Sequence, residues 1–406
     1  MKAQPRVGPL AVHRSLSPSK GTAPTLDVDA LIDDRSTHII VCCGAGGVGK
    51  TTTSAALALR AAERGRKVAV LTIDPARRLA QSMGIGQLDN TPRPVDGLVA
   101  SEGAEVGCLD AMMLDMKRTF DEVVEAQAAP EKARQILANP FYIALSSSFA
   151  GTQEYMAMEK LGQLYRDAQR ENTYDLIVVD TPPSRSALDF LDAPERLSSF
   201  LDGRFVRLLL TPARGPAKFM SAGFGMVTGA LSKILGGQFL RDLQTFVAAL
   251  DTVFGGFRTR AQQTYALLQA RQTAFLVVAA PEQDALREAA YFVERLSGDR
   301  MPLRGLVVNR AALDSPGLTS AAAYAAAERL DATASSAGPN PGSTTLTAGL
   351  LRLHANRAEL VARQEQLRQR FAAAHPQVPT VVVPALPGDV HDLDGLREVG
   401  HLLAGA

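Results

Sequence analysis

The feature that most constrains the fold is a glycine-rich loop between an apolar run and a helix-forming run. Residues 39–43 read Ile-Ile-Val-Cys-Cys, which is typical of a buried strand. Residues 44–51 then read Gly-Ala-Gly-Gly-Val-Gly-Lys-Thr, which is the Walker A pattern in the strand–loop–helix context that it requires. The alternative is a glycine-rich turn that binds nothing.

The residue types in this loop suit the phosphates of a nucleoside triphosphate. Glycines let successive backbone N–H groups point at phosphate oxygens without a Cβ in the way, and the N-terminus of the next helix adds its dipole. Lys50 is expected to reach the β- and γ-phosphates and to act in catalysis, while the Thr51 hydroxyl is expected to bind Mg²⁺. The predicted ATP-binding residues of the loop are Gly44, Ala45, Gly46, Gly47, Val48, Gly49, Lys50, Thr51 and Thr52.

Composition limits the class of protein. The 406 residues have room for one large domain or two, and a net charge of +1 offers no overall attraction to nucleic acid or to an anionic membrane. The three cysteines form neither a disulfide framework nor a Cys-x-x-Cys metal site, which indicates a reducing compartment. Two of them, Cys42 and Cys43, are adjacent on a strand, so one faces each side of the sheet and both are expected to act as small hydrophobes. No continuous apolar run precedes Ile39, so no signal peptide is predicted. We therefore expect a cytoplasmic protein without a nucleic-acid partner or stable membrane insertion.

Short apolar runs alternate with helical patterns along the rest of the chain. Strands are predicted at 66–74, 174–180, 273–279, 303–309 and 380–383. Helices are predicted at 110–137, 153–170, about 346–374 and after residue 392, and residues 86–107 are predicted to be a loop with one short strand. Because nearly all-apolar strands alternate with helices, the predicted fold class is α/β: a P-loop NTPase with a mostly parallel sheet, helices on both faces and an inserted helical subdomain.

Changes in composition and pattern divide the chain. Residues 1–34, rich in Pro, Ser and Gly, are expected to be a flexible N-terminal arm, in which Leu26 to Ile32 could form one docking turn. The ATPase domain is predicted at 35–195 and 269–406, interrupted by a helical insertion subdomain at 196–268. Within its second part, residues 331–345 are rich in Ser, Gly and Pro and are expected to form a flexible loop.

Two aspartates end predicted strands, at the edge where ligands bind in open α/β sheets. Asp74, followed by Pro75, is a candidate to orient the attacking water or the water shell of Mg²⁺; the alternative, compatible with the first, is an N-cap for the next helix. Asp180 follows four apolar residues as in a Walker B motif and is expected to bind Mg²⁺ through water, although it could instead only start a turn. In the following loop, 181–186, it stays open whether Arg185 contacts phosphate or solvent.

Together these motifs resemble the ArsA-type anion-transporting ATPases, a family that includes the targeting factors for tail-anchored membrane proteins. The resemblance spans about residues 37–402 and rests on residues 44–51, 74–76, 180–183, 307–309 and 383–387. It implies a dimeric ATPase with ATP and Mg²⁺ as cofactors, in which Asp74 activates water and Asp180 begins the second switch loop. It also implies that Asn309 reads adenine and that the base packs against Pro384, Ala385, Leu386 and Pro387.

The chain departs from the family pattern in three places. Ala45 stands where the family usually has a lysine that reaches across a dimer to the partner's phosphates. Arg185 and Ser186 replace a Gly-His pair, and the arsenite-binding cysteines and the zinc-binding Cys-x-x-Cys have no counterparts. The chain therefore looks most similar to a bacterial branch in which a subunit of this kind is paired with a related ATPase.

The insertion carries two apolar segments whose role stays open. Apolar residues at 239–257 recur at steps of three and four and share one helical face, and residues 219–231 are apolar and glycine-rich. The uncharged run between Lys218 and Lys233 is shorter than the ~20 residues of a membrane span. In the targeting factors that the chain resembles, this region forms a groove for an apolar helix of a client; the alternative is the core of an ordinary helical subdomain.

Two functions remain open at this point. The first is an ATP-hydrolysing, Mg²⁺-dependent dimeric switch whose helical subdomain responds to nucleotide state, and Asp74 and Asp180 favour it. The second is a catalytically weak regulatory subunit that binds ATP and pairs with a lysine-bearing homologous ATPase, and Ala45 favours it. A role on DNA or on a membrane surface is less favoured, because the sequence shows neither a basic patch nor a terminal amphipathic basic helix.

Overall fold

The computed structural model describes residues 24–73, 78–86, 88–101, 103, 105–140, 142–143, 146, 152–182, 256–313, 317–336 and 342–405. Within these residues eight strands form one sheet, in the order β3-β4-β2-β5-β1-β6-β7-β8. Neighbouring strands are parallel except for β3, which pairs antiparallel with β4. The predicted mostly parallel sheet is therefore confirmed. The strands are β1 (Ile39–Cys43), β2 (Lys67–Thr72), β3 (Arg93–Pro94), β4 (Cys108–Met113), β5 (Leu176–Asp180), β6 (Thr273–Ala279), β7 (Leu303–Ala311) and β8 (Thr380–Pro384).

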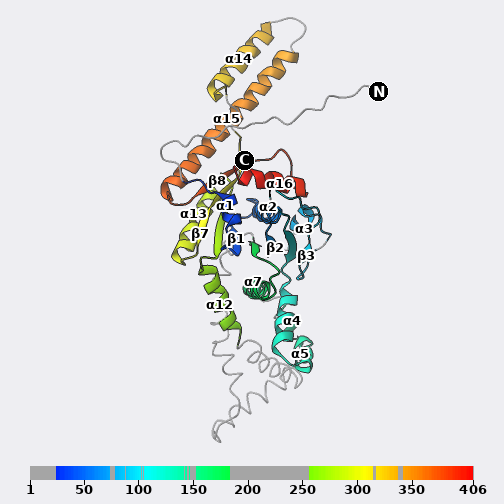
Figure 1. Cartoon of the computed structure of the whole chain (residues 1–406). Helices are drawn as coiled ribbons and strands as arrows, with labels where there is room; N and C mark the ends of the chain where they lie inside the picture. Colours follow the sequence, from blue (N-terminus) through cyan, green and yellow to red (C-terminus); the bar gives the residue numbers. More distant parts are fainter. Residues whose placement is uncertain are drawn as a thin grey trace, which may run out of the picture.

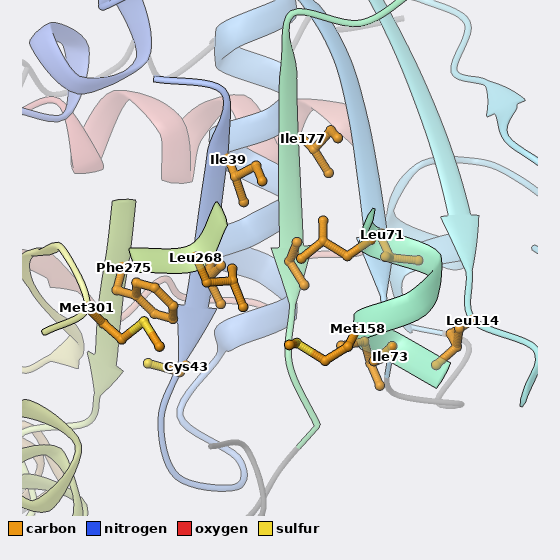
Figure 2. Packing of buried hydrophobic residues seen from close by; sticks show 14 of the residues in the cluster. Ile39, Cys43, Leu71, Ile73, Leu114, Met158, Ile177, Leu268, Phe275 and Met301 are labelled. Atoms are coloured by element: carbon orange, nitrogen blue, oxygen red, sulfur yellow. The ribbon is translucent and has the colours of Figure 1, made fainter. Parts of the chain in front are cut away.

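The core lies on both faces of the sheet, because successive strand residues point to opposite sides. Ile39 and Cys43 of β1 join one buried cluster, and Ile40 and Cys42 join the other. Figure 2 shows part of the first cluster, with Phe275 and other side chains of neighbouring strands packed together. Cys42 and Cys43 are both fully buried, as predicted, and burial raises the pKa of the Cys42 thiol to about 12.

Helices cover both faces, as the alternating pattern predicts (Figure 1). The helices that contribute to the first cluster include α4 (Met116–Gln127), α5 (Pro130–Leu137), α7 (Thr152–Glu171), α12 (Phe257–Gln269) and α13 (Gln283–Gly298). Those that contribute to the second are α1 (Val28–Asp33), α2 (Lys50–Glu63), α3 (Arg78–Ser82) and α16 (Leu393–Leu403). Helices α14 (Ser320–Ser336) and α15 (Gly342–Ala374) form a hairpin that extends away from the sheet, while Phe371 near the end of α15 is buried in the first cluster.

The helical prediction over 110–137 is wrong at its start and is confirmed from Met116 to Gln127 and from Pro130 to Leu137. Residues 108–113 form strand β4, which pairs with β2 along its length. Buried and half-buried residues largely alternate along β4, as they do in a pleated strand. The helix begins only after Asp115, whose side chain accepts a hydrogen bond of 2.9 Å from the backbone N–H of Arg118. A second helix then starts with Pro130 in its first turn, a position where the missing N–H does no harm.

The flexible loop expected at 331–345 is also wrong at both ends. Helix α14 continues to Ser336 and α15 begins at Gly342, so only residues 337–341 lie outside the described residues. Alanines of the two helices, including Ala327 and Ala348, are fully buried, and this packing outweighs the weak helix propensity of the serines and glycines.

The expectation of a flexible arm is wrong for residues 24–34, which pack on the body. Thr380 N–H donates to the carbonyl oxygen of Pro24 at 2.7 Å, and Leu26 N–H donates to that of Thr380 at 3.2 Å. The docking turn predicted from Leu26 to Ile32 is confirmed as α1, in which Ile32 is fully buried. Residues 1–23 lie outside the described residues.

The predicted insertion at 196–268 falls almost entirely outside the described residues, which resume at 256. Its last part is α12, whose Ala261 and Leu268 are buried in the first cluster. This helix therefore packs on the body of the protein. The division of the chain into domains, and the groove or core role of residues 219–257, stay predictions.

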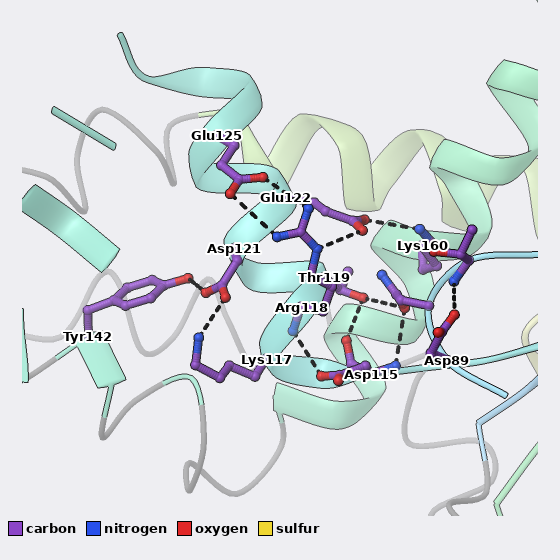
Figure 3. Close-up of polar contacts among 12 residues, drawn as sticks. Asp89, Asp115, Lys117, Arg118, Thr119, Asp121, Glu122, Glu125, Tyr142 and Lys160 are labelled. Carbon is purple, nitrogen blue, oxygen red and sulfur yellow. Dashed lines mark hydrogen bonds and ion pairs between the residues drawn. The ribbon is translucent and has the colours of Figure 1, made fainter. Parts of the chain in front are cut away.

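A polar network fixes α4 to its neighbours (Figure 3). Lys160 of α7 forms an ion pair of 3.0 Å with Glu122, and the Tyr142 hydroxyl donates a hydrogen bond of 2.7 Å to Asp121. The described part of the chain contains no group of His, Cys, Asp and Glu side chains arranged to hold a metal ion. We therefore assign this network a packing role.

Candidate nucleotide-binding site

The glycine-rich loop joins the end of β1 to the start of α2, as the Walker A pattern predicts. Gly44, Gly47 and Gly49 all have positive φ angles, of 150°, 76° and 94°. A Cβ on Gly44 would lie 2.1 Å from the Val278 carbonyl oxygen, and one on Gly49 would lie 2.2 Å from Nδ2 of Asn309. Gly44 and Gly49 therefore require glycine for space as well as for backbone conformation, and Gly47 requires it for conformation alone.

The N-terminus of α2 lies open at this loop. Its N-cap residue is Gly49, which supplies no side-chain hydrogen bond, and its first turn contains no acidic residue. Backbone N–H groups at an uncapped helix N-terminus bind anions, and the helix dipole favours negative charge there. The site can therefore hold a phosphate group.

Lys50 brings a buried positive charge to the same loop. Its side chain is 5% exposed, and its Nζ donates a hydrogen bond of 2.7 Å to the Ala45 carbonyl oxygen. The ammonium group therefore folds back across the loop, toward the residues that the sequence assigns to phosphate binding.

Asp180 meets Thr51 at the carboxyl end of β5. Its side chain is fully buried, and its Oδ2 accepts hydrogen bonds from Thr51 Oγ1 at 2.8 Å and from Thr72 Oγ1 at 2.9 Å. Thr72 is the residue that sequence reasoning missed here. The signal that could have found it is a threonine at the end of β2, the strand that pairs with the end of β5 at Asp180.

The residues present fit a magnesium ion. Thr51 and Asp180 supply a hydroxyl and a carboxylate, which are hard oxygen donors of the kind that Mg²⁺ prefers. Two such groups suffice because Mg²⁺ commonly completes its octahedron with water and substrate phosphates. The phosphates of a bound nucleotide would supply further ligands for the ion.

A cavity of about 610 Å³ extends from the loop toward the end of β8. It is large enough for a small organic ligand. We call it the base-side cavity. Of the predicted residues its lining includes Gly49, Thr51, Thr52, Asn309, Pro384, Ala385 and Leu386, but not Pro387.

Two consecutive residues at the end of β7 fasten the glycine-rich loop. Asn309 Nδ2 donates to the Val48 carbonyl oxygen at 2.9 Å, and Arg310 Nη1 donates to that of Gly47 at 2.9 Å. The pairing with β8 shifts its register between Val308 and Ala311, and Arg310 has a φ of 61°. This irregularity turns both side chains toward the loop, and no local sequence pattern predicts it for Arg310.

Arg310 also borders a second cavity, of about 300 Å³, on the other side of the loop. We call it the Ala45 cavity, since Ala45 lines it together with the acidic residues Glu282, Asp284 and Glu288. The exposed guanidinium of Arg310 forms no ion pair with any residue that the structure describes.

The two loops that follow strands β2 and β5 are only partly described. Asp74 and Arg185 lie outside the described residues, so their predicted roles are not tested. Ile73, the residue before Asp74, donates its backbone N–H to the Asp180 carbonyl oxygen at 3.0 Å. Thr181, at the start of the second loop, donates its hydroxyl to the Cys42 carbonyl oxygen at 2.8 Å.

A glycine-rich loop, an uncapped helix N-terminus, a buried lysine and a strand-end aspartate define a P-loop nucleotide-binding protein. Residues 37–320 match the sequence profile of the family described as anion-transporting ATPase, and the chain belongs to this family. It is thus an ArsA-type P-loop ATPase by family. The match ends at the residue where α14 begins.

Curated relatives support the same family. The chain is 28% identical over 307 residues to the protein named ATPase GET3 of Podospora anserina, which covers 72% of this chain and 78% of the relative. It is 27% identical over 297 residues to ATPase get3 of Neurospora crassa, with the same two coverages.

Among the described helices, none combines the length and the apolar character that crossing a bilayer requires.

Proposed function

We propose that this chain is a Mg²⁺-dependent ATPase that works as a dimeric switch, with a helical subdomain that responds to nucleotide state. The observation that carries the proposal is the contact between Thr51 Oγ1 and Asp180 Oδ2 at 2.8 Å, beside the uncapped N-terminus of α2. In P-loop NTPases the loop Ser/Thr and the Walker B aspartate hold the ion that neutralises charge on the transferred phosphoryl group.

In this proposal the described residues divide the work on ATP. Backbone N–H groups at the start of α2 bind phosphate oxygens. Lys50, which lies across the loop, holds the β- and γ-phosphates. Thr51 would ligate Mg²⁺ directly and Asp180 would hold it through water.

Two further roles complete the site. The base would enter the base-side cavity, where Asn309 reads adenine and residues 384–387 pack against the ring. Asp74 would orient the attacking water, since the strand that precedes it ends beside Asp180. An apolar helix of a client protein is the proposed partner of the insertion at 196–268.

The second candidate is a catalytically weak regulatory subunit, and Ala45 is the observation that favours it. Ala45 carries no charge and is 8% exposed, so a homodimer of this chain has no lysine at this position to deliver across its interface. In a heterodimer, a lysine-bearing homologue would supply that charge to the ATP bound by this chain.

Calorimetry with Mg-ATP and turnover by the purified chain test the proposal. Lys50→Ala should lose most of the affinity, because a buried charge beside the phosphates is removed. Lys67→Ala is the matched control: Lys67 is exposed and donates to the Asn172 carbonyl oxygen at 3.1 Å, so its loss should leave the affinity unchanged. Unchanged affinity in Lys50→Ala would overturn the site assignment.

Turnover by the wild-type chain alone supports the switch, whereas binding without turnover until a lysine-bearing homologue is added supports the regulatory subunit.

A further inference from the structure

The hairpin of α14 and α15 lies beyond the part of the chain that matches the family, since that match ends at residue 320. Figure 1 shows it extending away from the sheet. Nothing in the proposed ATPase mechanism uses it. Its exposed side chains therefore need an explanation of their own.

The fully buried side chains of the seam between the two helices are small. They belong to Ala323 and Ala327 of α14 and to Ala348 and Ala355 of α15. Polar contacts border the seam: the Tyr324 hydroxyl donates to Asn356 Oδ1 at 2.5 Å, and Arg352 pairs with Asp331.

Leucines gather instead on the outer face of α15. Leu346, Leu350, Leu353 and Leu360 are 66%, 58%, 67% and 42% exposed. Leu346 lies two residues before the buried Ala348, about 200° around the helix at 3.6 residues per turn, and so points away from α14. Four exposed leucines on one helix are a costly surface for a monomer, because each is an apolar side chain left in water.

The spacing of these leucines indicates what kind of structure would pack against them. Leu346, Leu353 and Leu360 are each seven residues apart, and Leu350 lies between the first two. Seven residues beyond Leu360, Leu367 packs against the first buried cluster, so the exposed stripe ends before it. The three evenly spaced leucines are the d positions of a heptad repeat with Leu350 at an a position, and such a stripe stays aligned with a partner only when that partner is another helix.

The charges beside the leucines indicate which charges a partner helix should carry. Arg357 and Arg363, both exposed, lie within one turn of Leu353 and Leu360 and form no ion pair with a described residue. Arg352 and Arg368 are already paired, with Asp331 and with Glu365. The uncompensated charge beside the leucines is therefore mostly positive, with Glu359 as the one exposed acid of residues 346–363.

We propose that the outer face of α15 is the docking surface for an amphipathic helix of another protein, with apolar residues in heptad spacing and carboxylates on their flanks. A second copy of α15 fits less well, because parallel pairing would place Arg357 of both copies in the same layer. A membrane surface also fits less well: the apolar stripe is narrow, and residues 342–370 contain no Phe, Trp or Tyr. The proposal does not depend on the proposed ATPase activity.

A synthetic peptide of about four heptads, with leucine at a and d and glutamate at e and g, is the probe; repulsion between its glutamates disfavours pairing with itself. Fluorescence anisotropy with the full chain should show that it binds at least about tenfold tighter than the same peptide with lysine at e and g. The double variant Leu350→Ser/Leu353→Ser should weaken binding of the glutamate peptide by about tenfold or more. The double variant Arg357→Glu/Arg363→Glu should instead favour the lysine peptide.

Val99→Ser is the matched control, since Val99 is 59% exposed but lies outside the hairpin, and it should leave binding unchanged. Melting temperatures should stay close to that of the wild type in all variants, because the substituted side chains are exposed. Equal binding of the two peptides, or binding of neither, would overturn the proposal. So would self-association that Leu353→Ser abolishes, or leucine-dependent binding to vesicles of phosphatidylglycerol and phosphatidylcholine without binding of the peptide.

Discussion

The hydroxyl of Thr72 donates a hydrogen bond of 2.9 Å to Oδ2 of Asp180, across two adjacent parallel strands. The same oxygen accepts from Thr51, so one carboxylate oxygen links β2, β5 and the first turn of α2. Thr72 lies two residues before Asp74. The end of β2 is thus tied to the proposed magnesium site.

Thr72→Val should weaken the binding of Mg-ATP about two- to tenfold, the equivalent of one hydrogen bond. Valine keeps the shape of threonine but cannot donate, so the Asp180 carboxylate loses one of the contacts that orient it. Calorimetry with and without EDTA measures the effect. The loss should appear only when Mg²⁺ is present; an equal loss in EDTA would mean that Thr72 merely supports the fold.

Asp74→Asn should leave the affinity for ATP intact and slow hydrolysis by about two to four decades, the usual contribution of a positioned proton acceptor. Single-turnover measurements separate this effect from product release. If the variant hydrolyses ATP at the wild-type rate, Asp74 serves only as a helix cap.

Arg310 offers a test of backbone strain and loop support together. Arg310→Ala and Arg310→Gly both remove the hydrogen bond to the Gly47 carbonyl oxygen, so both should weaken nucleotide binding to a similar degree. The φ of 61° disfavours alanine but not glycine, so the glycine variant should be the more stable by about 1 kcal/mol. Urea denaturation measures the difference, and equal stability would show that the backbone relaxes.

Arg66 is a buried cation that the sequence did not single out. Its side chain is 1% exposed; it pairs with Asp175 at 2.7 Å and donates to carbonyl oxygens that include those of Ile32 and Thr37. Arg66→Met should cost about 3–5 kcal/mol of unfolding free energy, since it leaves these acceptors without their donor.

Arg35→Met is the matched control for that loss. Arg35 pairs with the same Asp175 at 2.8 Å, but its side chain is 57% exposed, so its removal should cost less than about 1 kcal/mol. Urea denaturation of both variants decides whether burial, rather than the ion pair itself, sets the contribution. Similar losses in the two would contradict this account.

Local patterns predicted most of what positions the site. The glycine-rich loop, the strand before it and the strand that ends in Asp180 all carry their signal within a few residues, because the Walker motifs constrain backbone and chemistry together. The two-residue period of a strand predicted that Cys42 and Cys43 lie on opposite sides of the sheet.

What the sequence did not predict depends on contacts between distant residues. Strand β4 forms because its neighbour β2 offers an unpaired edge, which outweighs the helical spacing that continues into α4. The turned backbone at Arg310, the hydroxyl of Thr72 on Asp180 and the buried Arg66 each require two or more elements to be placed first. Helix α15 was predicted nearly in full, at 346–374, but the end of α14 and the start of α15 were predicted as loop because serines and glycines near residues 335–345 conceal helices that alanine packing stabilises.

The last prediction concerns Ala45, which lines the Ala45 cavity beside Glu282 and Glu288. A cation delivered to the transferred phosphoryl group is worth roughly 10³ to 10⁵ in rate, or about 4–7 kcal/mol of transition-state stabilisation. We therefore expect the wild-type chain alone to hydrolyse ATP slowly, and a lysine-bearing homologue to accelerate turnover. Ala45→Lys should restore part of the activity in a homodimer, because each copy would then carry a lysine that can reach its partner's phosphates. Ala45→Met has a similar length without the charge and should stay as slow as the wild type. Parallel assays should include Arg185→Ala: brisk turnover by the wild type that Ala45→Lys does not change and Arg185→Ala abolishes would show that Arg185 supplies the cation instead.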